Sequence, residues 1–240
     1  MESNMAPDTV KNARVAGFIY LLLVLVGPVR LEYIPNVLFV TGNAAATAAN
    51  LTSHDLLFRL GILSDVLAGV LSLILALALY RLFESVDRNL ALLIPIFGAL
   101  MVTPIYFVNT INDAAALLLA HGSGTLAAIE QPMREALTSL FLQLHHAGVT
   151  VNEVFWGLWL FPFGLLVIRS GFLPKFLGYW LILNGIAYLV DSFCGVVLPH
   201  YEDVVSRAAL PFQLGEVAIM LWLLIVGARP ARRPGSTEVG

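Results

Sequence analysis

Charged residues and cysteine are scarce in this sequence of 240 residues. Asp, Glu, Lys and Arg make up 12% of the chain, whereas soluble domains usually contain about 25%. The sequence therefore lacks the polar surface of a soluble enzyme, and its hydrophobicity excludes a disordered chain. A net charge of −3 provides no basic surface for nucleic acid. The single cysteine, Cys194, excludes an internal disulfide and a thiolate metal cluster.

The sequence contains long hydrophobic runs in place of charged residues. Hydrophobic residues reach 59%, and the mean hydropathy is +0.85. A helix that crosses the ~30 Å hydrocarbon core of a bilayer needs roughly 20 mostly apolar residues. The stretches that meet or nearly meet this length are 13–29, 56–80, 90–120, 137–168, 174–198 and 210–227. We expect an all-α fold: a polytopic membrane protein, with a six-transmembrane-helix bundle in the lipid bilayer.

The distribution of Lys and Arg predicts the orientation of this bundle. Nine of them fall on the side of the termini: Lys11, Arg14, Arg81, Arg88, Arg169, Lys175, Arg229, Arg232 and Arg233. Three fall in loops on the opposite side: Arg30, Arg134 and Arg207. The positive-inside rule then places both termini in the cytoplasm, as in a multi-pass protein of a prokaryotic plasma membrane. We divide the chain into a cytoplasmic segment 1–12, one transmembrane domain 13–227 and a disordered cytoplasmic tail 228–240.

Acidic residues inside the hydrophobic stretches are the strongest functional signal. Asp65, Glu153, Asp191 and Glu216 each lie within a predicted span. An ionised side chain at the bilayer centre costs about 2.5–3.5 kcal/mol even on the lenient insertion scale. These carboxylates therefore cannot face lipid, and must face one another, a polar partner or water.

Helical spacing brings further polar residues onto the same faces. His146 and Glu153 are seven residues apart on one predicted helix, as are Asn184 and Asp191 on another, so each pair shares a face. We expect a polar pocket that opens to the extracytoplasmic side and binds a small polar or cationic ligand. Its candidate residues are Arg59, Asp65, Asn109, His145, His146, Glu153, Asn184, Tyr188, Asp191, Gln213 and Glu216.

Simpler interpretations exist for some of these side chains. Arg59 lies one turn inside its helix, where a long side chain can extend to the outer headgroups. A position at the membrane interface is compatible with His145 and His146. A position above the membrane is compatible with Asp113. The acidic residues of the spans also suit a structural hydrogen-bonded network.

Several short motifs occur in an order that is similar to a known family. They are FRLGI at 58–62 followed by Asp65, LH at 144–145, FWG at 155–157, SGFLPK at 170–175, YLVDS at 188–192 and GE at 215–216. Together they resemble the bacterial membrane family called domain of unknown function 4386, over about 13–227. The resemblance implies a compact six-helix integral membrane protein.

The polar positions that carry the family resemblance are Arg59, Asp65, His145, Asp191 and Glu216. Glu153 is not part of the family pattern, so helical spacing is the one indication that it has a functional role. The resemblance favours His145, whereas helical spacing favours His146 as the partner of Glu153.

Three hypotheses of function follow from these residues. The first is binding or transport of a small polar or cationic solute, or of protons. The second is an intramembrane metal-dependent hydrolase, in which His145 or His146 ligates a metal with Glu153 and Asp191. The third is a non-catalytic sensor or assembly subunit, in which the polar residues fix helix packing. The sequence contains no metal-binding signature such as H-E-x-x-H, and we expect neither a metal nor another cofactor.

Overall fold

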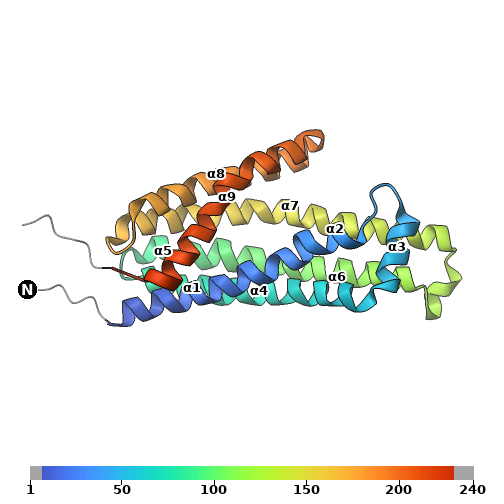
Figure 1. Cartoon of the computed structure of the whole chain (residues 1–240), viewed down its shortest axis with the longest axis horizontal. Helices are drawn as coiled ribbons and strands as arrows, with labels where there is room; N and C mark the ends of the chain where they lie inside the picture. Colours follow the sequence, from blue (N-terminus) through green and yellow to red (C-terminus); the bar gives the residue numbers. More distant parts are fainter. Residues whose placement is uncertain (1–6, 230–240) are drawn as a thin grey trace, which may run out of the picture.

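The chain is almost entirely helical in the computed structural model, which describes residues 7–229 (Figure 1). The α-helices are α1 (Pro7–Pro28), α2 (Ile34–Leu38), α3 (Ala44–Ser53), α4 (Asp55–Phe83), α5 (Arg88–Pro95), α6 (Val102–His121), α7 (Gln131–Ser170), α8 (Lys175–Val197) and α9 (Glu202–Leu221). Short π-helical segments are η1 (Val29–Tyr33), η2 (Ile96–Met101) and η5 (Trp222–Val226), and short 3-10 segments are η3 (Gly124–Ala128) and η4 (Pro199–Tyr201).

Six continuous helical stretches are long and apolar enough to cross a membrane, which confirms the predicted six-helix membrane fold. Their bounds are Thr9–Leu38, Asp55–Phe83, Arg88–His121, Gln131–Ser170, Lys175–Val197 and Pro199–Val226. Within the described residues, the first and last stretches begin and end at the same end of the bundle (Figure 1). Of the predicted terminal segments 1–12 and 228–240, residues 1–6 and 230–240 lie outside the described residues.

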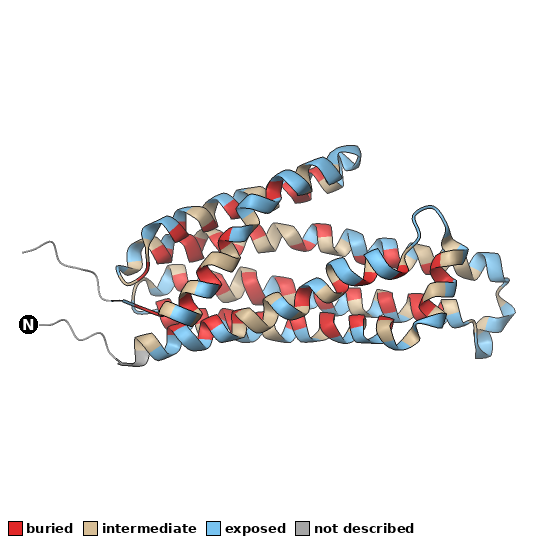
Figure 2. Ribbon diagram, in the orientation of Figure 1, coloured by how far each residue is buried: buried red, intermediate tan, exposed pale blue. Residues whose placement is uncertain are grey.

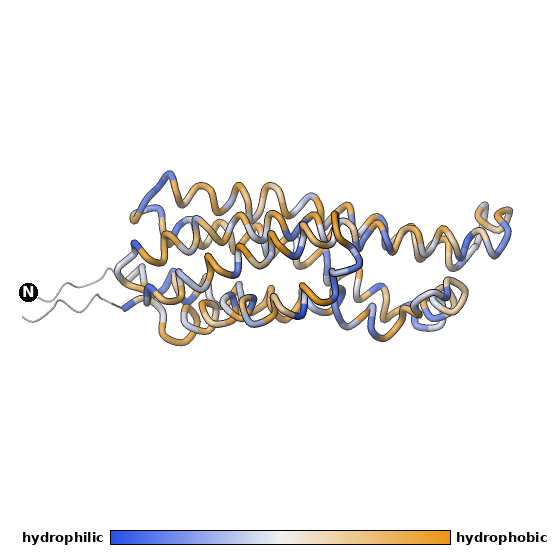
Figure 3. The backbone as a smooth tube through the Cα atoms, turned by 90° about the horizontal axis from the view of Figure 1, so that it is seen from above, coloured by the Kyte–Doolittle hydropathy of each residue, from blue (hydrophilic) through white to orange (hydrophobic). Residues whose placement is uncertain are grey.

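The longest helices exceed the thickness of a bilayer. At ~1.5 Å per residue, the 40 residues of α7 span about 60 Å, twice the ~30 Å hydrocarbon core. The bundle therefore extends beyond the hydrocarbon region. Figure 3 shows hydrophobic colours along most of the helices, with hydrophilic residues more frequent towards the ends and in the connecting loops.

The helix ends follow local sequence signals. Asn43 and Asp87 accept hydrogen bonds from the backbone N–H groups three residues later, and so cap α3 and α5. Gly122 and Gly171 follow α6 and α7 with positive φ angles of 58° and 70°, a conformation that glycine adopts without steric cost. Asp87 also accepts a hydrogen bond of 2.8 Å from Arg169, which joins the start of α5 to the last turn of α7 at the end of the bundle where the described chain begins and ends.

Two of the π-helical segments begin directly after a proline. Pro28 precedes η1, and Pro95 precedes η2. Proline removes one backbone N–H donor and its ring pushes against the carbonyl four residues earlier, so the helix widens locally instead of continuing in α form. Neighbouring helices tolerate such adjustments inside a membrane. The widened turns change which residues of the first and third spans face the centre of the bundle.

The interior is apolar and closely packed at the end where the described chain begins and ends. Phe83 of α4 contacts Phe163 of α7 edge to face, with ring centroids 5.8 Å apart. Helices α7 and α8 approach closely because small residues face each other, as is common between membrane helices. Buried residues line the inner faces of the helices, whereas the tip of the α8–α9 hairpin is largely exposed (Figure 2).

Replacing Gly164 with alanine is expected to destabilise the α7–α8 contact. A Cβ atom at position 164 would lie 2.6 Å from the carbonyl oxygen of Gly178, and overpacking of this kind costs about 1–3 kcal/mol. Thermal unfolding of the detergent-solubilised protein, followed by tryptophan fluorescence, measures the effect. Gly27→Ala is the control, because a Cβ there meets no atom within 4 Å. Equal unfolding temperatures for the two variants would contradict the close approach.

Candidate functional site

A buried ion pair joins the first and third membrane spans. Arg30 in η1 donates two hydrogen bonds to Asp113 in α6, from Nε to Oδ2 at 2.6 Å and from Nη2 to Oδ1 at 2.7 Å. Arg30 is 2% exposed and Asp113 0%, so neither charge reaches solvent. The parallel two-point geometry is the strongest form of an arginine–carboxylate contact. The rings of Phe39 and Phe58 lie over the guanidinium, 5.4 and 5.7 Å from its carbon.

His145 of α7 lies between two carboxylates, and the surrounding acceptors fix its orientation. Its Nδ1 lies 3.2 Å from Asp113 Oδ1 and 3.4 Å from the backbone oxygen of Asn109. Because a backbone carbonyl only accepts, we assign the proton of the neutral ring to Nδ1. The lone pair of Nε2 then faces Asp65, whose Oδ2 lies 3.6 Å away.

Several atoms of this cluster have no hydrogen-bond partner among the described residues. They are both carboxylate oxygens of Asp65, Oδ1 of Asn109 and Nε2 of His145. All three side chains are at most 2% exposed. Gly148 allows α6 and α7 to approach closely here, since a Cβ atom at that position would lie 2.1 Å from Asn109 Oδ1. We call Arg30, Asp65, Asn109, Asp113 and His145 the buried cluster.

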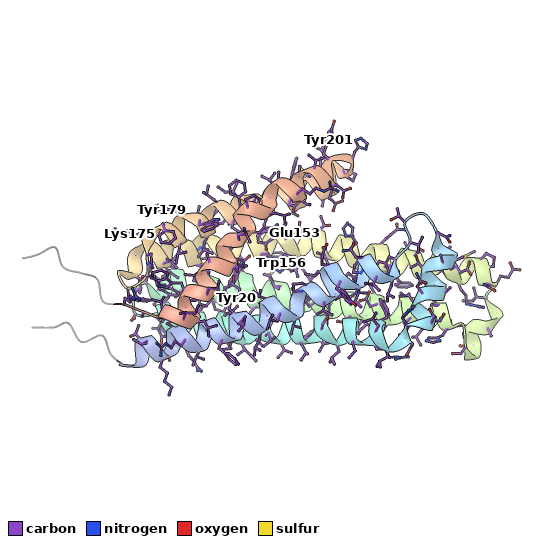
Figure 4. All side chains as sticks on the ribbon, viewed as in Figure 1. Tyr20, Glu153, Trp156, Lys175, Tyr179 and Tyr201 are labelled. Carbon is purple, nitrogen blue, oxygen red and sulfur yellow. The ribbon has the colours of Figure 1, made fainter. Side chains whose placement is uncertain are left out.

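A separate cavity of about 370 Å³ is lined by residues of α1, η1, α4, η2, α6, α7, α8 and α9. Aromatic side chains dominate its polar part: Tyr20, Tyr106, Trp156, Trp159 and Tyr188. Among the described residues, Glu216 is the one acidic side chain that lines it, and Gln213 lies one turn earlier on α9. We call this the aromatic cavity. Figure 4 shows Tyr20 and Trp156 in the middle of the molecule, where α1, α7 and α9 come together.

Two neighbours hold the Glu216 carboxylate in place. The Tyr20 hydroxyl donates a hydrogen bond to Oε1, and Asn184 Nδ2 donates one of 3.3 Å to Oε2. The donors come from α1 and α8, so the position of the carboxylate depends on three helices. A carboxylate that is oriented in this way, in a cavity lined by aromatic side chains, attracts a cation more strongly than one in water.

The aromatic cavity and the buried cluster lie at different heights along the bundle. At ~1.5 Å per residue, Glu216 and Trp156 lie roughly 15–21 Å from the helix ends nearest the two ends of the described chain. By the same measure, Asp65 and His145 lie roughly 27–38 Å from that end. The two sites adjoin, since Leu31 lines the cavity and the preceding residue, Arg30, belongs to the cluster.

Some of the predicted pocket residues belong to one or the other of these two sites. Asp65, Asn109 and His145 belong to the buried cluster. Tyr188, Gln213 and Glu216 line the aromatic cavity, and Asn184 binds Glu216.

The remaining predicted residues lie elsewhere. Arg59 is exposed and pairs with Asp55 at 2.6 Å, and His146 is exposed and lies 3.1 Å from Glu202. Asp191 is buried and accepts a 2.6 Å hydrogen bond from Ser206. Glu153 is half-buried on α7, near Trp156 (Figure 4). The expectation that Asp65, Glu153, Asp191 and Glu216 share one pocket is corrected: the contacts of Asp65, Asp191 and Glu216 belong to three different places.

Sequence reasoning missed Arg30, Asp113 and Tyr20 as site residues. Arg30 was expected in a loop because the first hydrophobic run is short, but η1 and α2 extend that span to Leu38. The apolar residues that follow Arg30 were the available signal. Asp113 shares a face with Asn109 four residues earlier, but a position above the membrane was left open as the alternative, and Asp113 was not among the candidate pocket residues. Tyr20 lies in an unbroken apolar run, and no sequence signal marks it. Of the two histidines, His145, which the family resemblance favours, is buried, whereas His146 is exposed.

A comparison with known protein families identifies the family of this chain. Residues 15–227 match the family described as "Domain of unknown function (DUF4386)". The chain belongs to this family. The match includes every residue of the buried cluster and of the aromatic cavity, so both sites lie within the DUF4386 domain.

A relative is found in the archaeon Archaeoglobus fulgidus, where it is described as an uncharacterized protein. It is 23% identical over 164 residues, which cover 67% of this chain and 79% of the relative. No solved structure matches the chain.

Replacing Arg30 with methionine is expected to lower the free energy of unfolding by about 3–5 kcal/mol, because it leaves Asp113 as an uncompensated buried charge. Unfolding of the purified protein in mixed detergent micelles, followed by circular dichroism, measures the loss. Arg59→Met is the matched control: its ion pair with Asp55 is exposed, and exposed pairs contribute little. Similar stability of the two variants would show that the Arg30 ion pair does not support the fold.

Proposed function

We propose that this multi-pass membrane protein binds a small cationic solute, such as an amine or a quaternary ammonium compound, in the aromatic cavity. The observation that carries the proposal is the position of Glu216: one oriented carboxylate among five tyrosine and tryptophan side chains. Ring faces carry partial negative charge, and aromatic cages are a common way of binding ammonium groups.

The size of the cavity supports a small ligand. About 370 Å³ lies at the lower end of the range for small-molecule sites, roughly 300–1,000 Å³. Its apolar lining residues, such as Leu23, Val24 and Val102, suit the alkyl part of an amine. A compact head that carries positive charge can then contact Glu216 and the aromatic rings together.

The charges of the lining residues favour a cation over an anion. None of the described residues that line the cavity is a lysine or an arginine, and the positive charge of Arg30 is paired with Asp113. Glu216 is half-buried, and a carboxylate in a membrane carries a desolvation cost unless a cation or a proton accompanies it. A bound ammonium group supplies this charge, while Gln213 offers a neutral hydrogen-bonding group one turn away.

We place the protein in a prokaryotic plasma membrane with both termini in the cytoplasm, on the basis of the Lys and Arg distribution. In this orientation the aromatic cavity lies near the middle of the bilayer, and the buried cluster lies closer to the extracytoplasmic side. The proposed function is binding of the cation, and transport of a bound cation is a separate measurement.

Binding of tetramethylammonium and of a small primary amine is expected to change the tryptophan fluorescence of the purified protein, because Trp156 and Trp159 line the cavity. Glu216→Gln is expected to weaken binding about 10- to 100-fold, which corresponds to the roughly 1.5–3 kcal/mol of a hydrogen bond to a charged group. A fluorescence titration in detergent micelles, checked by calorimetry, gives the dissociation constants.

Two controls make this titration specific. Glu84→Gln removes an exposed carboxylate at the end of α4 and is expected to leave the affinity unchanged. A neutral isostere of the quaternary ammonium probe, such as neopentane, tests whether positive charge is required. If Glu216→Gln binds the cations as tightly as the unmodified protein, the proposed role of Glu216 is wrong.

A further inference from the structure

We propose that the buried cluster is a binding site for a divalent transition-metal ion, with the carboxylate of Asp65 and Nε2 of His145 as ligands. Asp65, Asp113 and His145 each offer one ligand atom, and these atoms lie within 4.8 Å of one another. The three residues come from α4, α6 and α7, and each is at most 4% exposed. This site differs from the aromatic cavity in its residues and in its ligand.

The distance between Asp65 and His145 favours a metal ion over a hydrogen bond. Oδ2 of Asp65 and Nε2 of His145 lie 3.6 Å apart, which exceeds the roughly 2.7–3.2 Å of a nitrogen–oxygen hydrogen bond. Two ligands that each lie about 2.0–2.2 Å from one tetrahedral zinc ion are separated by roughly 3.3–3.6 Å. The observed separation therefore matches two ligands of a common ion.

The free lone pairs of the cluster point to the same conclusion. Both oxygens of Asp65 and Nε2 of His145 lack a hydrogen-bond partner among the described residues. Each of these groups is almost completely buried, so water at the surface does not satisfy them. Since Nδ1 of His145 carries the proton, Nε2 presents a lone pair towards Asp65. Buried polar atoms need a partner, and one cation between Asp65 and His145 would serve all three of these lone-pair atoms.

The charges of the cluster are consistent with an additional cation. The positive charge of Arg30 balances Asp113 through two short hydrogen bonds. Asp65 is then the uncompensated anion of the group, because His145 in its neutral form adds no charge. An uncompensated anion at this depth is costly, and a metal ion between Asp65 and His145 removes that cost.

Asp113 acts as a positioning residue in this site. Its Oδ1 lies 3.2 Å from Nδ1 of His145, and the carboxylate is itself held by Arg30. A carboxylate that accepts from the second ring nitrogen is the usual support of a metal-binding histidine, because it fixes the ring and the tautomer. One imidazole and one carboxylate, with no thiolate, suit Zn²⁺, Mn²⁺ or Fe²⁺ more than Ca²⁺ or Mg²⁺.

The test is the metal content of the purified, tag-free protein after removal of metal with a chelator and incubation with Zn²⁺. About one zinc ion per chain is expected for the unmodified protein. Asp65→Asn and His145→Gln are expected to retain less than about one-tenth of this amount, because each removes a ligand. Asp113→Asn is expected to weaken zinc binding about 10- to 100-fold while keeping the site.

The matched control is His146→Gln, since His146 neighbours His145 on the same helix but is exposed. It is expected to bind as much zinc as the unmodified protein, and so is Glu216→Gln, which alters only the aromatic cavity. No zinc in the unmodified protein, or equal zinc in His145→Gln and His146→Gln, would overturn the metal site and leave a protonated Asp65 as the explanation.

A second measurement does not depend on the folding of the ligand variants. Co²⁺ is added to the metal-free unmodified protein and to His146→Gln, and the visible absorption bands of bound cobalt are recorded. The proposal predicts the same saturable spectrum for both proteins, with an end point near one ion per chain and reversal by Zn²⁺. Absence of these bands, or their loss in His146→Gln, would contradict the assignment.

Discussion

The ion pair between Arg30 and Asp113 is the contact on which the inner arrangement of this membrane protein depends. It joins η1 to α6 through two hydrogen bonds in a region without solvent. Inside a bilayer, neither charge is stable alone, so the two helices must meet at this height. The same carboxylate orients His145, and the ring in turn faces Asp65. One electrostatic requirement thereby sets the relative positions of four membrane spans.

The polar groups of the bundle fall into two sites with different chemistry. Among the described residues, the aromatic cavity combines aromatic side chains with the carboxylate of Glu216, and this combination is the basis for proposing an organic cation as its ligand. The buried cluster combines unsatisfied oxygen and nitrogen lone pairs, which suit a metal ion. The two sites adjoin at Arg30 and Leu31, where the widened turn that follows Pro28 redirects the first span.

Hydrophobicity was enough to predict six helices, because each span is a long apolar run whose length follows from the bilayer. The contacts of the site were harder to predict, since they depend on helix rotation. Residue spacing places His146 and Glu153 on one face of α7, but it does not say which helix meets that face. Arg30 was missed because its charge was interpreted as the end of the first hydrophobic run, although the apolar residues after it belong to the same span. Asp65 and His145 were found because a buried charge is conspicuous in apolar sequence.

A double-mutant cycle on Arg30 and Asp113 tests the central claim most directly. The free energy of unfolding is measured for Arg30→Met, Asp113→Leu and the double variant in mixed micelles. We predict that each single variant is strongly destabilised and that the double variant recovers much of the loss, with a coupling energy of about 3 kcal/mol or more. Additive effects of the two substitutions would contradict a buried, mutually dependent pair.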